Sequence, residues 1–569
     1  MDTVMDQPGI GSKRTVPWAR AVARVMSRQL AVEVFGMPGY SQTLRGGHAE
    51  GYVASPRDFR PVHEGFGRAL LSGRFSLGGA RMTVGEGGDL WNRPCPSRPF
   101  ATELHRFSWL PHLVSLGEDG AREAMRLTLG WIQVFGNWSD FAWGRSVLAR
   151  RLINLCGAAR AMTFGVGPDG ASQLADSLLA QARHLKRLPF NRLHAAEDAF
   201  ALILVGCVLD GRVAMTLRDQ GLARLERALD AVMLEDGCHR SRNPEAMLEL
   251  LFDLHMLEDA LVQRMIPTPD SMSTAMSRLV RAIRTLRHPD GSLAAFQGGE
   301  GLPSERVSSA LPLDETLEPP VPVLSQGRFH RLVAGRIVAL VDAGEAHTGE
   351  FGAEACDHPL GLELSAGGER LIVGPGWSHR AAERQEFRIA GAASTLTLGE
   401  HALLSPMSGK MGDLLGHPLA GRPYTIRSHR AEAADRGILL EMEHDGWTPR
   451  FGLRHSRRLY VDPSREEVRG EDQLIPVGGA KPGLIAAPFT IRFLLHPHVK
   501  VTISRDQKSA LLSGLSGQAW WLRSDANDMQ IDPGAVFIRG RAQHTQQVVL
   551  KGVARTDTPT RVRWKVFQA

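Results

Sequence analysis

The spacing of the apolar residues changes once along this chain, from the period of a helix to the alternation of a strand, and the change falls near residue 290. Before it, apolar side chains recur every three or four positions, as Leu148, Leu152 and Cys156 do, which places them on one face of a helix. After it, short runs such as residues 360–365 alternate between their two faces, as strands do. The chain is therefore expected to form a helical domain followed by a sheet domain.

Four further apolar stripes follow the first one in the helical part. They consist of Leu174, Leu178, Ala182 and Leu185; Leu222, Leu225, Leu229 and Val232; Leu250, Leu251 and Leu254; and Met272, Met276, Leu279, Ile283 and Leu286. Arg150, Arg151 and Arg160 fall largely outside the first stripe. Successive helices joined by short turns build an all-α layer, which fits either a solenoid or a closed toroid of helical hairpins.

The boundary between the two parts is expected within residues 288–327, where helical periodicity stops and prolines and glycines accumulate. We predict a helical domain over residues 1–295, less regular over 1–100, a linker over 296–327, and a sandwich domain over 328–569. The alternating runs of the last part are separated by regular turns, which indicates a large antiparallel β-sandwich.

Charge and hydropathy narrow the range of partners. The formal net charge of +6 permits an acidic partner, but neither a concentrated Lys/Arg stripe nor a reading motif is found, so no nucleic-acid binding is predicted. No run approaches the roughly 20 apolar residues that span a bilayer, and no uninterrupted signal-peptide core is found. We expect no integral membrane segment and a cytoplasmic location by default. The sequence leaves the oligomeric state open.

One stretch, residues 342–377, carries a His-bearing loop followed by two β-type runs around a Gly turn. It resembles the opening of the C-terminal sandwich in the heparinase II/III-like proteins. The matching residues are Cys356 to His358, Gly361 to Leu364, Gly367 to Gly368, and Leu371 to Gly376. Further segments that resemble the family occur in the same order, namely GRFSLGG, PSRPFATELHRFSWL, LEDGCHRSRNPEAMLELLFDL, RHPDGSLAAFQGGEG, RFHRLVAGRIVALVDAG, ASTLTLGE, HDGWTPRFGLRHSRRLYV and PFTIRFLLHP. The resemblance implies an incomplete α/α toroid followed by a large antiparallel β-sandwich.

In that family the reaction is β-elimination, which cleaves the bond at C4 of a uronic acid without water. It needs donors from Asn, His or Arg that neutralise the sugar carboxylate, a base that takes the C5 proton, and an acid that protonates the departing oxygen. The resemblance implies a polysaccharide lyase whose partner is an acidic polysaccharide or oligosaccharide. No cofactor is expected, and the analogy with the family also allows a periplasmic location.

Some members of the family hold a structural zinc ion with His residues and an Asp. Gly374 stands at the position of that Asp, and His444 and His455 are two isolated histidines without a spaced third ligand. We therefore predict no metal.

Two segments of the helical part resemble the family's cleft. In NRLHAAEDAFALILVG, His194 matches the His of a paired Asn-His, Leu193 stands at the Asn, and Asn191 is a substitute if the loop is rearranged. In DGCHRSRNPEAMLELLFDL, His239 and Arg240 follow a turn into a helix, where they could meet an anionic sugar. His194 or His239 is the expected base, and Arg240 the expected carboxylate binder. As an alternative, His194 caps or packs a helix start.

The third part of the predicted site is the sandwich loop. His358 lies about two places from the family's His and would neutralise charge or donate a proton, and His347 is a further candidate on the same loop. Trp138 could stack on a sugar ring. The alternatives are an ordinary surface residue for His358 and a core residue for Trp138. A group of sandwich arginines could also bind an anionic polymer, or simply be solvated. These are Arg450, Arg454, Arg457 and Arg458.

One element of the family's chemistry is missing. No tyrosine stands near Ala246, where the family places its Tyr. The tyrosines of the chain are Tyr40, Tyr52, Tyr424 and Tyr460. Loss of a general acid or base costs roughly 10²- to 10⁴-fold in rate, so the alternative function is a catalytically degenerate glycan-binding or exopolysaccharide-assembly protein on the same fold. A hydrolase is a poorer third choice, because Glu197 and Asp198 look like helix-surface residues.

Overall fold

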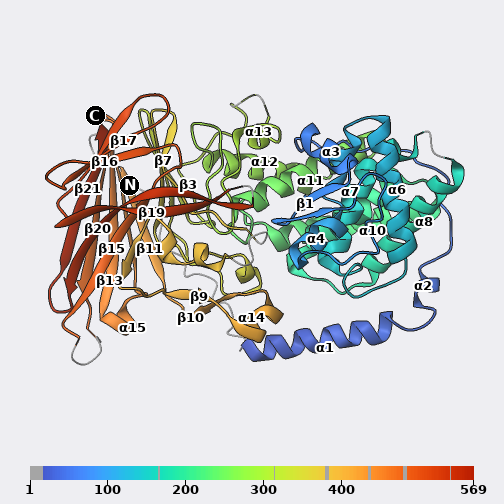
Figure 1. The fold of residues 1–569 in the computed structure, drawn as a ribbon, viewed down its shortest axis with the longest axis horizontal. Coiled ribbons are helices and arrows are strands. Elements are labelled where there is room, and N and C mark those ends of the chain that lie inside the picture. The colour runs from blue at the N-terminus through green and yellow to red at the C-terminus, as the bar shows by residue number, and fades with distance from the viewer. Residues whose placement is uncertain are drawn as a thin grey trace.

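Helices make up the first half of the molecule and antiparallel sheets the second, as the two periods predict (Figure 1). The computed structural model describes residues 17–164, 167–312, 314, 316–378, 384–432, 437–478, 484–538 and 540–569. The α-helices in this part of the chain are α1 (Pro17–Phe35), α2 (Tyr40–Thr43), α3 (Glu64–Leu71), α4 (Arg98–Arg106), α5 (Leu110–Val114), α6 (Glu118–Phe135), α7 (Arg145–Thr163), α8 (Pro168–Arg187), α9 (Ala195–Val208), α10 (Arg212–Val232), α11 (Pro244–Gln263), α12 (Asp270–Thr285), α13 (Ser304–Ser308), α14 (Gly409–Leu415) and α15 (Thr448–Phe451).

The strands pair antiparallel throughout their described ladders. They are β1 (Arg74–Leu77), β2 (Ala80–Thr83), β3 (Val323–Leu324), β4 (Phe329–Ala334), β5 (Ile337–Asp342), β6 (Gly361–Ala366), β7 (Glu369–Ile372), β8 (Leu396–Leu398), β9 (Leu404–Pro406), β10 (Leu419–Gly421), β11 (Ile426–Glu432), β12 (Ile438–His444), β13 (Leu453–Asp462), β14 (Glu467–Pro476), β15 (Ala486–Leu494), β16 (Lys500–Ile503), β17 (Ser509–Ser513), β18 (Ala519–Ser524), β19 (Asp528–Ile538), β20 (Arg541–Arg555) and β21 (Thr560–Gln568). The large sheets have the orders β11-β12-β13-β14-β21-β18-β17-β16, β3-β4-β5-β6-β7 and β19-β20-β15-β8. Helices followed by a large antiparallel sandwich confirm the predicted fold class.

The helical half is built around α9. Apart from Glu197 and Asp198, every residue of α9 is buried, and a helix that is apolar on nearly all sides belongs in the centre of a domain. It contacts α7, α8, α10 and α11. The five predicted stripes lie on α7, α8, α10, α11 and α12, so the helical interpretation of these segments is confirmed.

The five-stranded sheet lies between the helices and the rest of the sandwich. In β5, Val338 and Leu340 belong to the apolar core of the helical half, whereas Ile337, Ala339 and Val341 belong to the core of the sandwich. Side chains alternate between the two faces of a strand, and every residue of β5 is buried. The two cores therefore share this sheet, which fixes the helices relative to the sandwich.

The hairpin predicted around the Gly turn is formed by β6 and β7. Gly367 and Gly368 make its turn with φ angles of 61° and 86°, a region that favours glycine. A second hairpin, β19 and β20, reaches the segment that follows α12, because the backbone N–H of Gly540 donates to a carboxylate oxygen of Glu300 over 2.8 Å. The hairpin thus crosses from the sandwich to the end of the helical half.

The most C-terminal strand, β21, lies inside the eight-stranded sheet. It pairs with β14 along one side and with β18 along the other. The sheet is therefore assembled around a strand that is made last.

The first helix, α1, lies apart from the other helices, along the lower edge of the view in Figure 1. It contacts α2 and α14. The apolar side chains of Val22, Val25, Met26 and Leu30 are exposed on it. No helix within the described ranges is long and apolar enough to cross a membrane.

A buried ion pair joins the two halves. Arg242, between α10 and α11, contacts Asp342 at the end of β5, and the two side chains are only 4% and 1% exposed. The Arg242 guanidinium also donates to the carbonyl oxygens of Gly327 (2.9 Å) and Glu345 (3.0 Å). The second carboxylate oxygen of Asp342 accepts from the Gln297 side chain over 2.8 Å. A buried pair with its donors and acceptors satisfied in this way holds its elements in one arrangement.

Replacement of Arg242 by Met should destabilise the protein strongly, because the charge of Asp342 would be buried without its partner. We expect a loss of about 3–5 kcal/mol in the free energy of unfolding, measured from denaturant or thermal unfolding. Arg122→Met is the control, since the pair of Arg122 with Asp119 is exposed at 72% and 75% and such pairs contribute about 0–1 kcal/mol. Equal stability of the two variants would contradict the role given to the buried pair.

Candidate functional site

Two loops meet beside this ion pair. One joins α10 to α11 and carries His239, and the other follows β5 and carries His347 and Phe351. Arg242 belongs to the first loop and Asp342 borders the second, so the ion pair sets the distance between them. The ring of Phe351 lies 5.7 Å from that of His239 and 6.3 Å from that of His347, between centroids. The structure therefore brings these two predicted site residues together.

His239 is held by its own turn. Its backbone pairs with that of Met233, and its ring nitrogen Nδ1 lies 2.7 Å from the hydroxyl oxygen of Ser241. Burial lowers the pKa of His239 to about 4, although the carboxylates of Glu354 and Glu197 act in the opposite direction. The ring is neutral at neutral pH and is chemically able to accept a proton.

His347 has an unused ring nitrogen. Burial lowers its pKa to about 4, and the charge of Arg242 adds to this shift. Its Nε2 atom is buried and has no hydrogen-bond partner in the described part of the chain. Because buried polar atoms are almost always paired, this nitrogen marks a place where a water molecule or a ligand group would be bound.

His194 approaches the same region from the start of α9. Its Nδ1 lies 3.7 Å from a carboxylate oxygen of Glu197. Glu197 pairs with Arg150 of α7 over 2.5 Å, and Arg150 pairs with Asp253 of α11 over 2.7 Å. Burial disfavours the charged form of Glu197, but Arg150, His194 and Arg106 together outweigh this effect and hold the pKa of Glu197 well below its ordinary value. Since Glu197 also acts on His239, this network connects His194 to the histidine pair.

Glu197 and Asp198, expected as helix-surface residues, are partly buried. The side chain of Asp198 is 19% exposed and lies 3.2 Å from Arg145, the first residue of α7. Burial raises the pKa of Asp198 to about 7, while Arg145 acts against the rise. Both acids are counter-ions of α7 arginines. The period of α9 does not reveal this, because the arginines come from another helix.

Arg240 stands close to a second arginine, Arg192. Its Nε donates to the carbonyl oxygen of Asp230 over 3.1 Å, and burial, together with the charge of Arg192, lowers the pKa of Arg240. Two neighbouring guanidinium groups form a positive region suited to a carboxylate. Asn191 has a local role here, because its side-chain oxygen accepts from the backbone N–H of Leu193 over 3.0 Å and caps the 3-10 turn η1 (Arg192–His194).

Two other predicted site residues, His358 and Trp138, make contacts within the protein. His358 is 5% exposed, and its Nε2 lies 2.9 Å from the carbonyl oxygen of Phe387. It is thus neither an exposed surface residue nor the loop histidine that lies with His239, which is His347. Trp138 packs against Phe35 at the end of α1, with 6.0 Å between the ring centroids.

The tyrosine side chains form contacts of their own. Tyr40 and Tyr52 form hydrogen bonds within the helical half. In the sandwich, Tyr424 donates to Asp357 over 2.6 Å, and Tyr460 lies on β13. These hydroxyl contacts of Tyr40, Tyr52 and Tyr424 are with residues other than His239 and His347.

The histidines considered for zinc form part of the sandwich core instead. His444 and His455 are buried, their rings are 3.1 Å apart at the nearest nitrogens, and His455 also lies 2.8 Å from Asp472. Within the described ranges, no group of three or more His, Cys, Asp or Glu side chains is arranged to hold a metal ion.

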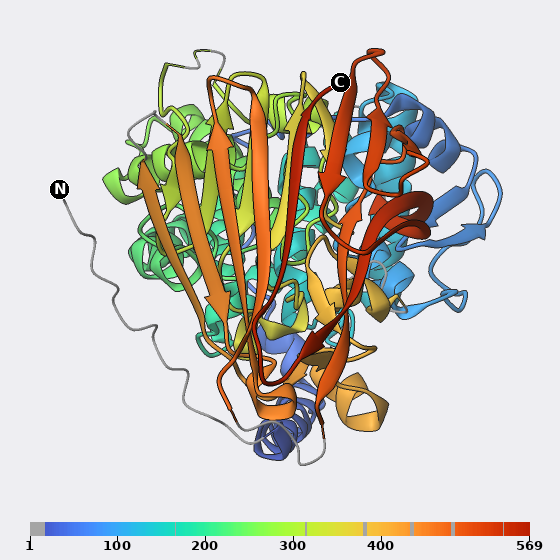
Figure 2. The ribbon, with the colours of Figure 1, turned by 90° about the vertical axis from the view of Figure 1, so that its left-hand side faces the viewer.

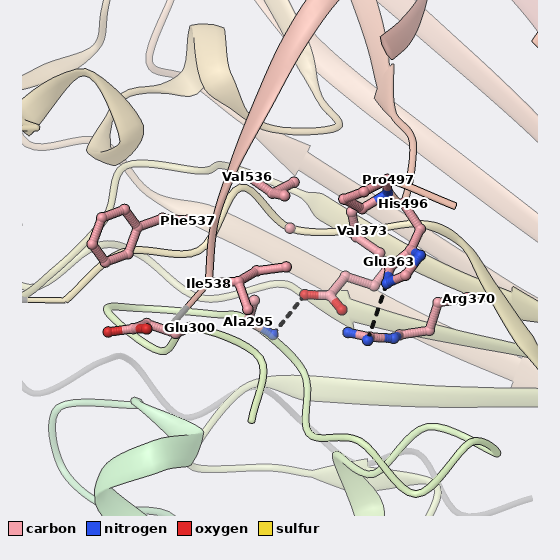
Figure 3. A pocket seen from close by; sticks show the side chains of 11 residues that line it. Ala295, Glu300, Glu363, Arg370, Val373, His496, Pro497, Val536, Phe537 and Ile538 are labelled. Carbon is pink, nitrogen blue, oxygen red and sulfur yellow. Dashed lines mark hydrogen bonds between the residues drawn. The ribbon is translucent and has the colours of Figure 1, made fainter. Parts of the chain in front are cut away.

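A cavity near the junction is too small for a sugar. It lies between the segment after α12, the β6–β7 hairpin and β19 (Figure 3), and its volume is about 10 Å³, which is room for about one water molecule. Arg370 and His496 meet there at 3.2 Å, and Glu363 accepts from the backbone N–H of Ala295 over 2.8 Å. We therefore place the candidate site at the loops around Phe351.

A helical half joined to an antiparallel sandwich, with histidines and arginines where they meet, defines the fold class of the heparinase-like polysaccharide lyases. The family model described as heparinase II/III-like, C-terminal, matches residues 316–565. A curated relative, FtsZ-localized protein C of Caulobacter vibrioides (strain NA1000 / CB15N), is 38% identical over 541 residues, which cover 94% of each chain. This chain belongs to the heparinase II/III-like family.

Solved structures agree on the fold. The crystal structure of heparinase III matches with a TM-score of 0.71 at 14% identity, over 96% of this chain and 92% of that chain. Heparan sulfate lyase HepC from Pedobacter heparinus matches with a TM-score of 0.56 at 15% identity, over 97% of this chain and 90% of that chain. At these identities the likeness concerns the fold and not the activity.

Stability should fall as the pH is lowered from about 6.5 to about 4, because the unfolded chain then binds protons that His239 and His347 do not bind when folded. Below about pH 4 this contribution should level off. His347→Gln removes one of the two groups, so the midpoint of thermal unfolding should fall less steeply with pH than in the wild type. His48→Gln, which changes an exposed ring, is the control. Parallel curves for wild type and His347→Gln would show that burial of His347 does not suppress its protonation.

Proposed function

We propose that this chain is a binding protein of lyase ancestry, which holds an acidic saccharide at the loops around Phe351 without cleaving it, and that it localises with FtsZ. The second part is supported by the relative that is 38% identical over 94% of both chains and whose name states that it is FtsZ-localized. The named lyases share only 14% and 15% identity with this chain.

The absence of cleavage is supported by the contacts of the tyrosines. β-Elimination needs a group that protonates the departing oxygen, and Tyr424, the tyrosine nearest in sequence to these loops, is partly buried and donates to Asp357. His239 and His347 are neutral at neutral pH, with pKa values of about 4. Imidazoles with such pKa values are poor proton donors at that pH.

Binding is supported by groups that face the same region. Arg240 and Arg192 supply positive charge beside His239, and the Nε2 atom of His347 is buried without a partner among the described residues. A sugar carboxylate and hydroxyl would satisfy these groups. The residues present at the site are therefore sufficient to bind an acidic saccharide.

A lyase is the second candidate, and the neutral histidine pair favours it. His239 would take the C5 proton, and Arg240 would hold the carboxylate. The departing oxygen would then be protonated by water, which costs rate but does not forbid the reaction.

Incubation with uronate polymers should give no unsaturated product. Ultraviolet absorbance of the 4,5-unsaturated uronate would be followed with heparan sulfate, alginate and bacterial exopolysaccharides, and binding to the same polymers would be measured by calorimetry. We expect saturable binding to one of them, weakened about ten-fold or more in Arg240→Gln because a charged contact is lost. A rise in absorbance that disappears in His239→Ala would instead establish the lyase.

In cells of the source organism, a fluorescent fusion of this chain should follow labelled FtsZ through the division cycle. The control is the same fusion in cells depleted of FtsZ, where the localised signal should disperse. A distribution that does not change on depletion would refute the proposed association, whatever the saccharide assay shows.

A further inference from the structure

The outer face of the eight-stranded sheet is basic. The sheet lies at the end of the molecule away from the helices, and Figure 2 shows it face-on. One of its faces covers the sandwich core, and the other is open to solvent. We call the open face, from β11 to β18, the basic face. Its Arg and Lys side chains are Arg427, Arg454, Arg458, Arg469, Arg523, Arg561, Arg563 and Lys565.

Strand alternation divides the arginine group noted in the sequence. In β13, Arg454 and Arg458 point to the basic face, whereas Arg457 points into the core and pairs with Asp472 over 2.7 Å. Arg450 lies in α15, with its guanidinium 5.8 Å from the ring centroid of Phe451. Arg454 and Arg458 therefore belong to the basic face, whereas Arg457 is a buried structural residue.

On the basic face most of the acidic side chains are less exposed to solvent than the arginines. Glu471 is 20% exposed and is shared by three arginines, at 3.8 Å from Arg458, 3.6 Å from Arg561 and 3.3 Å from Arg563. Arg458 and Arg563 are 54% and 56% exposed. One carboxylate cannot use all the donors of three guanidinium groups. Arg458 also pairs with Glu441 over 2.8 Å, and the donors that remain are left to solvent or to a partner.

The excess of positive charge is local. The carboxylates on the basic face are Glu441, Glu443, Asp462, Glu467 and Glu471, which is five against the eight cations named above. Asp506 and Asp525 border the face near Arg523 and Arg563. Over the whole chain the balance is nearly even, at 67 Lys and Arg against 61 Asp and Glu.

Aromatic rings lie among the cations. Phe567 and Trp521 are neighbours across β21 and β18, and both are partly exposed. Lys565 lies 4.2 Å from the ring centroid of Phe567, and Arg469 lies 5.7 Å from that of Tyr460. A partner that carries both carboxylates and apolar side chains matches this mixture better than a polymer with charge alone.

We propose that the basic face binds an acidic and partly apolar segment of a protein partner. Arginine suits carboxylates through paired N–H donors, and strands about 4.8 Å apart present these donors in rows that an extended peptide can follow. This inference does not rest on the proposed function, since it concerns another surface of the molecule than the loops around Phe351.

The test is fluorescence anisotropy of a labelled peptide of Asp, Glu and Leu, titrated with the purified full chain. The same peptide with Asn and Gln in place of the acids is the uncharged control. We expect binding of the acidic peptide only, weakened by added salt and by at least about ten-fold in the double variant Arg458→Glu, Arg563→Glu. The matched variant Arg68→Glu, Arg122→Glu changes two exposed arginines of the helical half and should bind the peptide as the wild type does.

Three outcomes would overturn the proposal. They are no binding of the acidic peptide, equal loss in both double variants, and heparin or single-stranded DNA binding more tightly than the peptide with the same dependence on Arg458 and Arg563. The last outcome would assign the face to a polyanion. An unchanged thermal unfolding midpoint of the variants shows that any loss comes from charge and not from unfolding. Colocalisation with FtsZ is measured separately, so it can fail or succeed independently.

Discussion

The arrangement of this molecule depends on one buried carboxylate, that of Asp342. Arg242 and Gln297 reach it from two segments of the helical half, and both have positive φ angles, 62° and 47°, which residues other than glycine rarely adopt. Such conformations persist where surrounding contacts over-determine them. Because His239 precedes Arg242 by three residues and His347 follows Asp342 by five, the same pair also positions the candidate site. A change at this carboxylate would therefore act on fold and function together.

The shared sheet explains how the family's architecture can be kept while residues at the junction vary. β5 packs against the helices with one face and against the sandwich with the other, so the junction is set by apolar packing that does not involve the site. The loops that carry His239, Arg240 and His347 lie at this junction, and single positions on them are free to vary. The absence of a tyrosine near Ala246 is a local difference of this kind, while the fold is retained.

The sequence predicted the order of the domains, the five helical stripes and the hairpin of residues 361–372, because each depends on a local period or turn. The site roles of His239, Arg240 and His347 stay predictions, and the structure brings His239 and His347 together around Phe351. Sequence-based prediction failed where a partner comes from a distant segment. Arg151 falls outside the apolar stripe but is fully buried, because it lies 4.1 Å from the ring centroid of Trp131 and bonds to Gln181. His358 and Glu197 are further cases of this kind, and periodicity contains no signal for such pairs.

The central position of β21 has a consequence for how the chain is made. Residues 560–568 pair with β14 and with β18, so during synthesis these strands wait for a partner that has not yet left the ribosome. Local helical contacts form early, whereas pairings across such sequence distances form late. Until then, the edges of β14 and β18 are open to other chains. The solvent-facing charges of the sheet, including Arg469 and Glu471 on β14, then serve a second purpose, because they keep an unfinished sheet from joining its neighbours.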